Sequence, residues 1–380
     1  MNIAFAIHES LAAQGGVEVL AREMIRYFSK SHQVYLISID SSETLKNLTE
    51  GRMLAGNFTI PKDRVISMDW IGSLVSWLKK HEINLCHFHS GGTYGFNARS
   101  WSCCPITCVS QAGIRCIVTN HQAVCFFNRL RSKRPLWREL LAAIANWPGK
   151  AMQLSAVDAE VTVSNHDLAL SKNYFPFHQK KMRRIYHSRL EALEKMTPVS
   201  KSRTILNMAT LARIKGQYIL LEAFNSVSDE FPEWRLKLVG YDSNDGSSEI
   251  LRKRIAMLDL SKKVDLCGPH TDPRQFYRTA ELYVQPSLAE AFGLSLQEAM
   301  FHGLPCIGSR VGGIPELISE GQTGYLVEPG NINSLAQALR KLMADRAERE
   351  RLGAAAHASI QERGMNRQKM LEQYSNLYGF

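Results

Sequence analysis

Hydrophobic and polar positions follow two alternating patterns along the chain. Short, continuous apolar runs predict buried strands, and longer stretches with apolar residues three or four positions apart predict amphipathic helices. In the second half, strands are predicted at 204–209, 235–240, 264–268, 282–286, 305–309 and 324–327. Helices are predicted there at 217–227, 248–258, 274–280, 294–301, 315–319, 332–344, 346–362 and 366–377. This alternation is typical of a doubly wound parallel sheet.

The first half carries the same alternation less regularly. Strands are predicted at 2–8, 33–39, 83–89, 115–120, 159–164 and 183–188. Helices are predicted at 69–81 and 167–174, and a third run with helical spacing ends at Ser29. Residues 189–203 lose this periodicity and contain Pro198, which favours a linker.

The fold class predicted is α/β, with two Rossmann-like, doubly wound parallel-sheet domains that face each other across a cleft. We expect an N-terminal domain at 1–190, a linker at 191–203, a second domain at 204–364 and a terminal helix at 365–380. A length of 380 residues fits two domains better than one core.

The composition indicates the cellular compartment and shows whether the chain is globular or spans a membrane. The chain is 45% apolar and 22% charged, and no apolar stretch reaches the roughly 18 residues of a membrane-spanning helix. The first residues lack a basic region and a long apolar core, so they predict a strand and not a signal peptide. The eight cysteines fit no zinc-binding spacing, and several lie in apolar runs, which favours buried thiols in a reducing cytosol. We therefore expect a cytoplasmic protein.

The net charge of +10 implies contact with nucleic acid, an anionic membrane or phosphorylated substrates. In the segment 125–152, aromatic and leucine side chains interleave with Arg and Lys, a pattern that suits the surface of an anionic membrane. The same segment would suit a phosphorylated acceptor, or it is an ordinary helix with a solvated basic face. No nucleic-acid motif accompanies the charge, so we expect no nucleic-acid partner.

Several candidate residues follow strands of the first half. Gly15 and Gly16 would let the backbone approach a ligand closely, although a plain turn is the alternative. His87, His89 and His121 lie at or just past the carboxyl ends of predicted strands, where open α/β sheets bind ligands. Structural hydrogen bonding is the competing interpretation for all three histidines.

The second half offers cations and glycines after its strands. Arg213 and Lys215, close to a predicted helix start, could hold a diphosphate. Gly240 ends a strand and leaves room for a base or ribose against the backbone. The Gly312-Gly313 turn could present N–H groups to an anion.

Two carboxylates, Glu290 and Glu298, stand eight residues apart. Ser295 and Glu298 form a capping-box pattern, so Glu298 could bond back to the start of its own helix. Alternatively it could grip the two hydroxyls of a ribose. Glu290 precedes the turn and is not explained by capping.

These residues resemble a known family. Glu290, seven residues and Glu298, preceded by Gln-Pro-Ser and followed by Glu-Ala-Met-Phe-His-Gly-Leu-Pro, are similar to the E-x7-E signature of retaining glycosyltransferases of family 4. The pattern continues in Val311-Gly-Gly-Ile-Pro-Glu-Leu, Gly321-Gln-Thr-Gly-Tyr-Leu-Val, Leu238-Val-Gly240 and Lys215-Gly216. It extends less closely to Gly15-Gly16-Val-Glu18, Val118-Thr-Asn-His121 and Val161-Thr-Val-Ser164.

The resemblance implies a GT-B fold whose C-terminal domain binds the nucleotide-diphosphate sugar and whose N-terminal domain binds the acceptor. The terminal helix is then expected to return to the N-terminal domain. The resemblance implies a role for each matching residue: Glu298 at the ribose, Glu290 near the sugar, Lys215 at the diphosphate, Phe292, Gly293, Leu294 and Ser295 in the turn whose amides meet diphosphate and sugar, Gly16 in the N-terminal loop and His121 at the sugar's edge.

Two positions depart from the family's pattern. Thr210 stands where an arginine is usual, so Arg213 could substitute for it. His187-Ser188 replaces the usual Asn-Gly, which leaves the linker-side contacts open.

The function expected is retaining, metal-independent transfer of a hexosyl or N-acetylhexosaminyl group to a glycan or lipid-linked acceptor, without a cofactor. Cell-envelope polysaccharide or lipopolysaccharide synthesis, peripherally on the inner face of the plasma membrane, fits the basic segment. The alternatives are a sugar-nucleotide epimerase and a non-catalytic homologue that acts as a partner subunit. The sugar, the nucleotide, the acceptor and the oligomeric state are not readable from the sequence.

Overall fold

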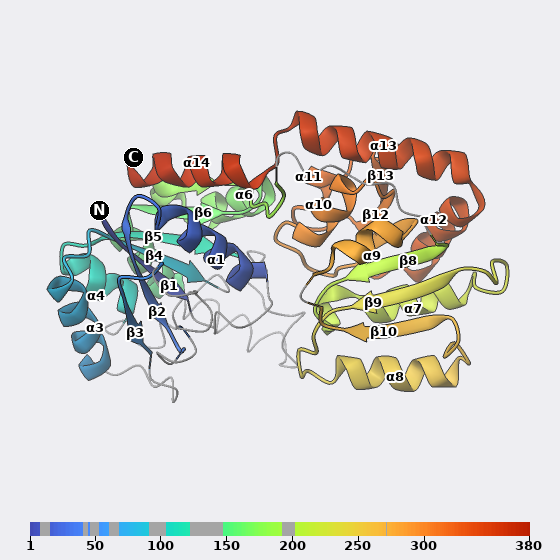
Figure 1. The fold of residues 1–380 in the computed structure, drawn as a ribbon, viewed down its shortest axis with the longest axis horizontal. Coiled ribbons are helices and arrows are strands. Elements are labelled where there is room, and N and C mark those ends of the chain that lie inside the picture. Colours follow the sequence, from blue (N-terminus) through green and yellow to red (C-terminus); the bar gives the residue numbers. More distant parts are fainter. Residues whose placement is uncertain are drawn as a thin grey trace. The chain divides into compact units, whose positions relative to one another are not determined.

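Two compact units make up the computed structural model of the protein. The structure describes residues 1–7, 16–40, 45, 53–60, 68–90, 104–121, 147–191, 202–270 and 272–380. Unit 1 contains Met1–Tyr186 together with Leu371–Phe380, and unit 2 contains His187–Met370. Each unit is a sheet with helices packed on it (Figure 1).

Unit 1 is built on a parallel sheet. Its described strands are β1 (Asn2–Ile7), β2 (Gln33–Ser38), β3 (Gly56–Thr59), β4 (Leu85–Ser90), β5 (Arg115–Asn120), β6 (Ala159–Thr162) and β7 (Met182–Arg184). They lie in the order β3-β2-β1-β4-β5-β6-β7 and every pair is parallel. The order reverses where β1 meets β4, which is the switch point at which doubly wound sheets bind ligands.

The helices of unit 1 connect these strands. They are α1 (Gly16–Phe28), α3 (Met68–Lys80), α4 (Pro105–Gln111) and α6 (Asn165–Tyr174), with a short 3-10 helix at Pro176–Lys181. Residues 147–156 are also helical. Strands β1 and β5 are buried along almost their whole length, because helices cover both faces of the sheet, and this explains their continuous apolar runs.

The terminal helix α14 (Arg367–Tyr378) belongs to unit 1 from Leu371 onward. The buried Tyr378 hydroxyl lies 2.5 Å from Nδ1 of His87, and the buried Tyr374 hydroxyl lies 3.0 Å from Oγ1 of Thr119. Arg115 donates to the main-chain oxygen of Tyr378 at 2.9 Å. The last residues of the chain therefore pack on the first unit, as the family resemblance implies.

Unit 2 repeats the architecture more compactly. Its strands are β8 (Thr204–Met208), β9 (Arg235–Val239), β10 (Val264–Gly268), β11 (Leu282–Gln285), β12 (Cys306–Ser309) and β13 (Gly324–Val327). They are parallel in the order β10-β9-β8-β11-β12-β13, so the switch point lies between β8 and β11. The two doubly wound parallel sheets expected from the sequence are confirmed.

The helices of unit 2 enclose an apolar core. They are α7 (Gln217–Asn225), α8 (Ser247–Met257), α9 (Arg274–Thr279), α10 (Leu294–Phe301), α11 (Ile314–Leu317), α12 (Ile332–Ala344) and α13 (Arg346–Glu362). Helices α7 and α12 pack on one another through buried side chains such as Leu220, Phe224 and Leu339. Trp234 is fully buried in the same core.

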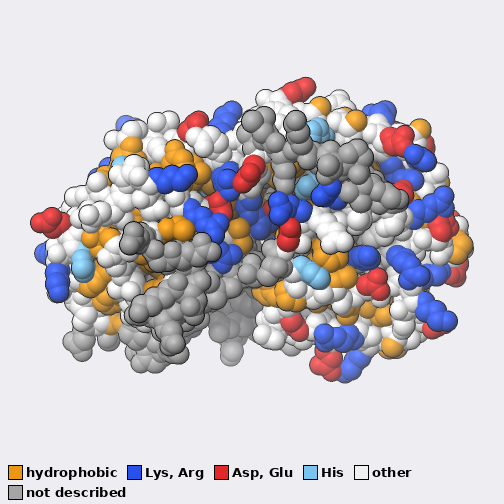
Figure 2. All heavy atoms as spheres, viewed as in Figure 1, with side chains coloured by type: hydrophobic (Ala, Val, Ile, Leu, Met, Phe, Trp, Pro, Cys, Tyr) orange, Lys and Arg blue, Asp and Glu red, His pale blue; other side chains and the backbone are white. Residues whose placement is uncertain are grey.

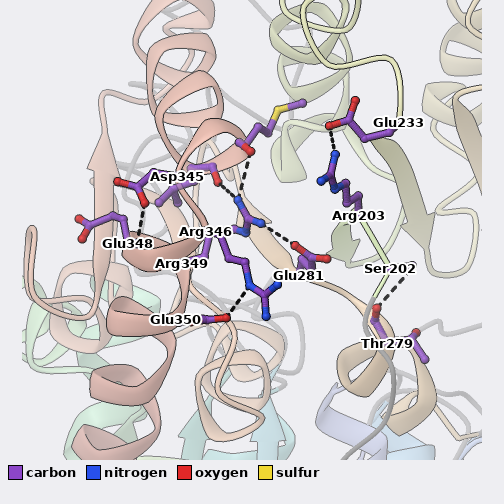
Figure 3. Close-up of polar contacts among 12 residues, drawn as sticks. Ser202, Arg203, Glu233, Thr279, Glu281, Asp345, Arg346, Glu348, Arg349 and Glu350 are labelled. Atoms are coloured by element: carbon purple, nitrogen blue, oxygen red, sulfur yellow. Dashed lines mark hydrogen bonds and ion pairs between the residues drawn. The ribbon is translucent and has the colours of Figure 1, made fainter.

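Buried and exposed ion pairs fasten the edges of unit 2 (Figure 3). Arg349 of α13 is buried, donates to the carbonyl of Leu342 at 2.7 Å and pairs with Glu281 at 2.8 Å. Arg203, just before β8, pairs with Glu233 at the surface. The α13 contact fixes that helix to the start of β11, whereas the exposed pair adds little stability.

The pattern-based elements of the second half agree with the structure to within two residues. Strand β3 and helix α4 were not predicted from the sequence. Strand β3 is an edge strand of four residues that is nowhere fully buried and includes Gly56 and Asn57, so it has no apolar run. Helix α4 begins at Pro105 without a side-chain cap and spans seven residues, too few for a periodic pattern. Within the described part of the chain, no helix has the length and apolarity needed to cross a membrane.

Candidate functional site

One cluster of polar side chains in unit 2 lies at its switch point. The loop after β8 carries Lys215, and the loop after β11 carries Glu290. The carboxyl ends of these neighbouring parallel strands meet at one edge of the sheet, so residues 75 positions apart in the chain come together.

Glu290 accepts three hydrogen bonds on one oxygen. Lys215 Nζ donates to Oε2 at 2.9 Å, Gln285 Nε2 donates at 2.9 Å, and Ser287 Oγ donates at 3.2 Å. Tyr283 in turn donates to the side-chain oxygen of Gln285 at 2.6 Å. Burial, with nearby carboxylates, raises the pKa of Tyr283 far above its usual range, so its hydroxyl stays a donor.

Two glycines bring the loops into direct backbone contact. Gly216 has φ +70°, and a Cβ there would lie 2.0 Å from the carbonyl oxygen of Pro286. Gly312 has φ +53°, and its Cβ would lie 1.6 Å from the carbonyl oxygen of Glu290. Any side chain at either position would displace the Glu290 loop, so these glycines fix where the carboxylate lies.

Helix α10 begins directly beyond this loop. Its N-cap is Gly293, with φ +103°, and no side chain caps the helix. The first N–H groups of an α-helix have no partner within the helix, and the positive end of the helix dipole favours anions there. The buried Phe292 and the half-buried Leu294 and Ser295 complete the turn.

The capping-box interpretation of Glu298 is wrong. Because Gly293 is the N-cap, Ser295 lies inside the helix and Glu298 cannot close a box with it. Instead Glu298 Oε1 lies 2.5 Å from Nη2 of Arg189, and Oε2 accepts from the Tyr277 hydroxyl at 2.8 Å. The ring of His302 stacks on Tyr277 with centroids 5.4 Å apart.

The side chains of this second cluster are charged and mostly buried, with Arg189 21% exposed and Glu298 10% exposed. Burial lowers the pKa of Arg189, but the Glu298 carboxylate together with Tyr277 and Tyr283 more than offsets burial, so the pKa is raised. Burial and the same carboxylate raise the pKa of Tyr277 far above its usual range. Arg189 therefore remains a cation and Tyr277 remains a hydroxyl donor.

Two other candidates of unit 2 have contacts that the sequence did not predict. Arg213 has an exposed side chain, and its backbone N–H donates to Asp245 Oδ2 at 3.1 Å. Gly240 has φ +155°, and a Cβ there would lie 2.0 Å from the carbonyl oxygen of Ala209. The approach of this neighbouring backbone is enough to require a glycine at 240.

The candidates of unit 1 lie at helix and strand ends. Gly16 is the exposed first residue of α1. His121 directly follows β5, and its Nε2 lies 2.9 Å from Nδ1 of the buried His89. His87 lies between Thr119, at 2.8 Å, and Tyr378, so its role is to join the sheet to α14.

Part of the sequence prediction falls on residues that the structure does not describe. Gly15 and most of the basic segment 125–152 lie outside the described residues, and only 147–152 of that segment are described. In the described ranges, no three His, Cys, Asp or Glu side chains lie together as a metal site. The described cysteines are free, and Cys86, Cys104, Cys116 and Cys306 are buried.

Four residues of the two clusters were not predicted from the sequence. Gln285 and Ser287 were part of the quoted Gln-Pro-Ser signature but received no role. Arg189 and Tyr277 carried no local signal, because they meet Glu298 only through the fold.

Family models cover nearly the whole chain. One described as "Glycosyl transferases group 1" matches residues 188–359, and one described as "Glycosyltransferase Family 4" matches residues 14–188.

Curated relatives align over part of their length. N-acetyl-alpha-D-glucosaminyl L-malate synthase of Bacillus anthracis is 32% identical over 198 residues, 51% of this chain and 50% of the relative. D-inositol 3-phosphate glycosyltransferase of Pseudarthrobacter chlorophenolicus is 32% identical over 166 residues, 43% of this chain and 40% of the relative. The chain thus spans half the length of these relatives or less.

Solved structures align over the full chain. HepE of Anabaena in complex with UDP has a TM-score of 0.76 at 18% identity, over 100% of this chain and 99% of that one. WaaG, a glycosyltransferase involved in lipopolysaccharide biosynthesis, has a TM-score of 0.76 at 13% identity, over 100% of both chains. At these identities the likeness shows a common fold.

Proposed function

The chain belongs to glycosyltransferase family 4, with a GT-B fold, and from this premise we propose that it transfers a sugar from a nucleotide-diphosphate sugar to a hydroxyl acceptor with retention of configuration. The observation that carries the proposal is the contact of Lys215 with Glu290 beside the uncapped start of α10. A cation, free helix N–H groups and two carboxylates at a switch point suit a sugar nucleotide.

Each cluster has a proposed role toward the donor. Lys215 and the N–H groups of Gly293, Leu294 and Ser295 would bind the diphosphate, and Glu290 would bind the sugar hydroxyls. When Lys215 turns to the diphosphate, Glu290 Oε2 keeps its neutral donors from Gln285 and Ser287. The carboxylate would therefore stay in place without its cation. Glu298 would accept from the ribose hydroxyls.

The chemistry proposed needs no enzyme nucleophile. The bond from the anomeric carbon to the diphosphate oxygen breaks while the acceptor oxygen bonds to the same face of that carbon. The acceptor's proton passes to the departing phosphate oxygen. Lys215 and the helix N-terminus would stabilise the negative charge that develops on the leaving group, which is the electrostatic contribution usually largest in such sites.

For residues of unit 1 the proposed roles rest on the family resemblance. Gly16 would approach the donor through its backbone, and His121 would contact the sugar. Arg213 is retained as a second diphosphate cation because its exposed side chain has no partner among the described residues.

The donor proposed is a UDP-sugar, since structures of the similarly folded HepE contain UDP and UDP-glucose. The acceptor proposed is a glycan or lipid-linked saccharide of the cell envelope, met at the inner face of the plasma membrane. The likeness to WaaG and the aromatic, basic character of 125–152 support this choice of acceptor.

The test is donor turnover by Lys215→Gln against a matched lysine. Wild-type protein should release UDP from UDP-glucose, and Lys215→Gln should lower the rate by about a hundredfold or more. Lys253→Gln removes a lysine of α8 that pairs with Glu249 at the surface, and it should keep the wild-type rate. Analysis of the sugar product without acceptor separates transfer and hydrolysis from epimerisation. Equal rates for both variants would overturn the proposal. So would thermal-shift screening in which the wild type bound none of the UDP-, GDP-, ADP- and dTDP-sugars.

A further inference from the structure

The chain segment that follows β7 is anchored to helix α10. Gln297 of α10 donates to the carbonyl of His187 at 3.3 Å. Ser188 donates to the carbonyl of Met365 at 3.0 Å, and the N–H of Arg367 donates to the carbonyl of Leu190 at 2.8 Å. The backbone of Arg189 is thus held on both sides, and its side chain is delivered to Glu298, the residue next to Gln297.

The guanidinium of Arg189 has most of its hydrogen-bonding capacity unused. Nη2 meets Glu298 Oε1 at 2.5 Å, and no other acceptor among the described residues takes one of its N–H groups. Nε is fully buried without a partner, although the side chain as a whole is 21% exposed. A guanidinium carries five N–H donors, and buried donors are normally satisfied. The missing acceptors indicate a ligand.

The Glu298 carboxylate can accept further hydrogen bonds, as the Arg189 guanidinium can donate them. Arg189 occupies Oε1 and Tyr277 occupies Oε2, with one donor on each oxygen. A carboxylate can accept about four hydrogen bonds, so one further donor can approach each oxygen. The cluster therefore offers acceptors from Glu298 and donors from Arg189 side by side.

The net charge of the cluster indicates which kind of ligand it would bind. Arg189 and Glu298 together are neutral, so an anion gains little from them, unlike at Lys215. A vicinal diol both donates and accepts hydrogen bonds and carries no charge. Of the parts of a sugar nucleotide, the ribose has this chemistry next to the proposed diphosphate site.

We propose that Arg189 and Glu298 form a single ribose clamp, in which Arg189 is a positioning residue that holds the Glu298 carboxylate and donates to the ribose oxygens. This inference rests on the proposed function and deepens it, because it assigns Arg189 a role in binding the donor. It also places a cation near the donor in a chain that has Thr210 where the family usually has arginine.

The experiment compares UDP with 2′-deoxy-UDP by calorimetry. Wild-type protein should bind UDP about tenfold more tightly or better, because the deoxy ligand leaves charged groups of the clamp unpaired. Arg189→Ala should reduce this preference to about twofold or less, and Arg189→Lys should retain part of it. The KM for UDP-glucose should rise in Arg189→Ala while kcat changes little.

A matched control is the Arg254–Glu222 pair of the same unit, which joins α8 to α7 and has Nε 2.5 Å from Oε1. Arg254→Ala should leave the ratio of the two affinities unchanged. Circular dichroism and thermal unfolding of each variant confirm that it is folded.

Two results overturn the inference while the proposed function stands. One is equal weakening of both ligands in Arg189→Ala, which would mark a structural residue. The other needs no variant: equal affinity of wild-type protein for UDP and 2′-deoxy-UDP. Should the wild type bind GDP instead of UDP, the same comparison is made with 2′-deoxy-GDP. Failure to bind any nucleoside diphosphate would overturn the proposed function itself.

Discussion

His89 is a buried imidazole at the end of a central strand. Its Nδ1 bonds to His121, whereas its Nε2 is buried and has no partner. Burial lowers the pKa of His89 from 6.5 to about 3, since a charged imidazole would lose its hydration without a compensating anion. The native protein therefore keeps this side chain neutral at all but strongly acidic pH.

The lowered pKa of His89 predicts a loss of stability on acidification. Between pH 6.5 and about 3 the unfolded chain binds a proton at His89 that the native protein does not bind. The free energy of unfolding therefore falls as pH falls through this window and is unaffected by His89 above it. From pH 7 to pH 5 the loss from this group should be about 2 kcal/mol.

Urea unfolding of His89→Gln at pH 7 and pH 5 measures the contribution of His89 to this loss of stability. The variant should lose about 2 kcal/mol less than the wild type over that interval. His270→Gln, at an exposed position, serves as the control and should follow the wild type. Parallel stability curves for His89→Gln and wild type would contradict a neutral, buried His89.

At the residue scale, the sequence identified carboxylates and cations better than their partners. Glu290 and Lys215 were singled out from position and family pattern, and they do meet. Arg189 and Tyr277 were not, because they lie 109 and 21 positions before Glu298 and no periodicity relates them. Their roles toward a ligand, like those of Glu290 and Lys215, remain predictions.

At the scale of elements, the turn at Gly312 packs directly against the Glu290 loop and so fixes the position of that loop. Gly312 and Gly321 both have positive φ, +53° and +70°, so an alanine at either one adopts an unfavourable backbone conformation. They differ in surroundings: the Cβ of residue 312 would meet the Glu290 carbonyl oxygen at 1.6 Å, whereas at 321 nothing lies within 4 Å. Comparing alanine substitutions at the two positions therefore separates the cost of backbone strain from the cost of displacing the Glu290 loop.

Gly321→Ala should lower the free energy of unfolding by about 1 kcal/mol, which is the cost of the left-handed conformation alone. Gly312→Ala should cost about 2 kcal/mol more, because the Glu290 loop must move. It should also weaken UDP-glucose binding, whereas Gly321→Ala should not. Thermal unfolding and calorimetry provide the two measurements. Equal behaviour of the variants would show that contact with the Glu290 loop does not matter.

Elements buried on both faces were predictable because burial imposes an apolar run. Strand β5 was placed at its observed bounds, as were α10 and α12. Edge strand β3 and the short helix α4 were not, since neither needs a strong pattern to be held in place by neighbours. The capping-box reading of α10 failed for a related reason: a glycine N-cap leaves no side-chain signal in the sequence.

For the whole molecule, the pattern predicted two doubly wound units, but only the family resemblance implied that the chain returns to its first unit. That return depends on Tyr374 and Tyr378 meeting the sheet of unit 1, and periodicity does not report such contacts. The net charge of +10 is likewise a property of the whole chain. On the face drawn in Figure 2, Lys and Arg side chains are mixed with acidic ones, so local chemistry must decide where a charged partner binds.

One region of unit 1 combines exposed apolar side chains with positive charge. Phe177, in the 3-10 helix Pro176–Lys181, is 92% exposed. Met152 is 44% and Trp147 39% exposed on residues 147–156, to whose backbone Lys181 donates. Lys172, Lys180, Lys181 and Arg183 also belong to this part of the chain, where Asp167 is buried and Asp158 is the exposed carboxylate. Apolar tips within a basic surface suit an anionic bilayer, which supports the proposed peripheral contact and extends it to Phe177.

Vesicle sedimentation should therefore detect binding to liposomes with about 30% phosphatidylglycerol, and binding should weaken as salt screens the basic side chains. Phe177→Ser should reduce the partition coefficient between vesicles and water about fivefold, because roughly 1 kcal/mol of apolar burial in the bilayer is lost. Met257→Ser is the control, since Met257 is 76% exposed on α8 of unit 2 and lies outside this region. If both variants bound like the wild type, or weakened equally, the exposed tip at Phe177 would not be the membrane contact, and an acceptor carried by a lipid would lose its support from this surface.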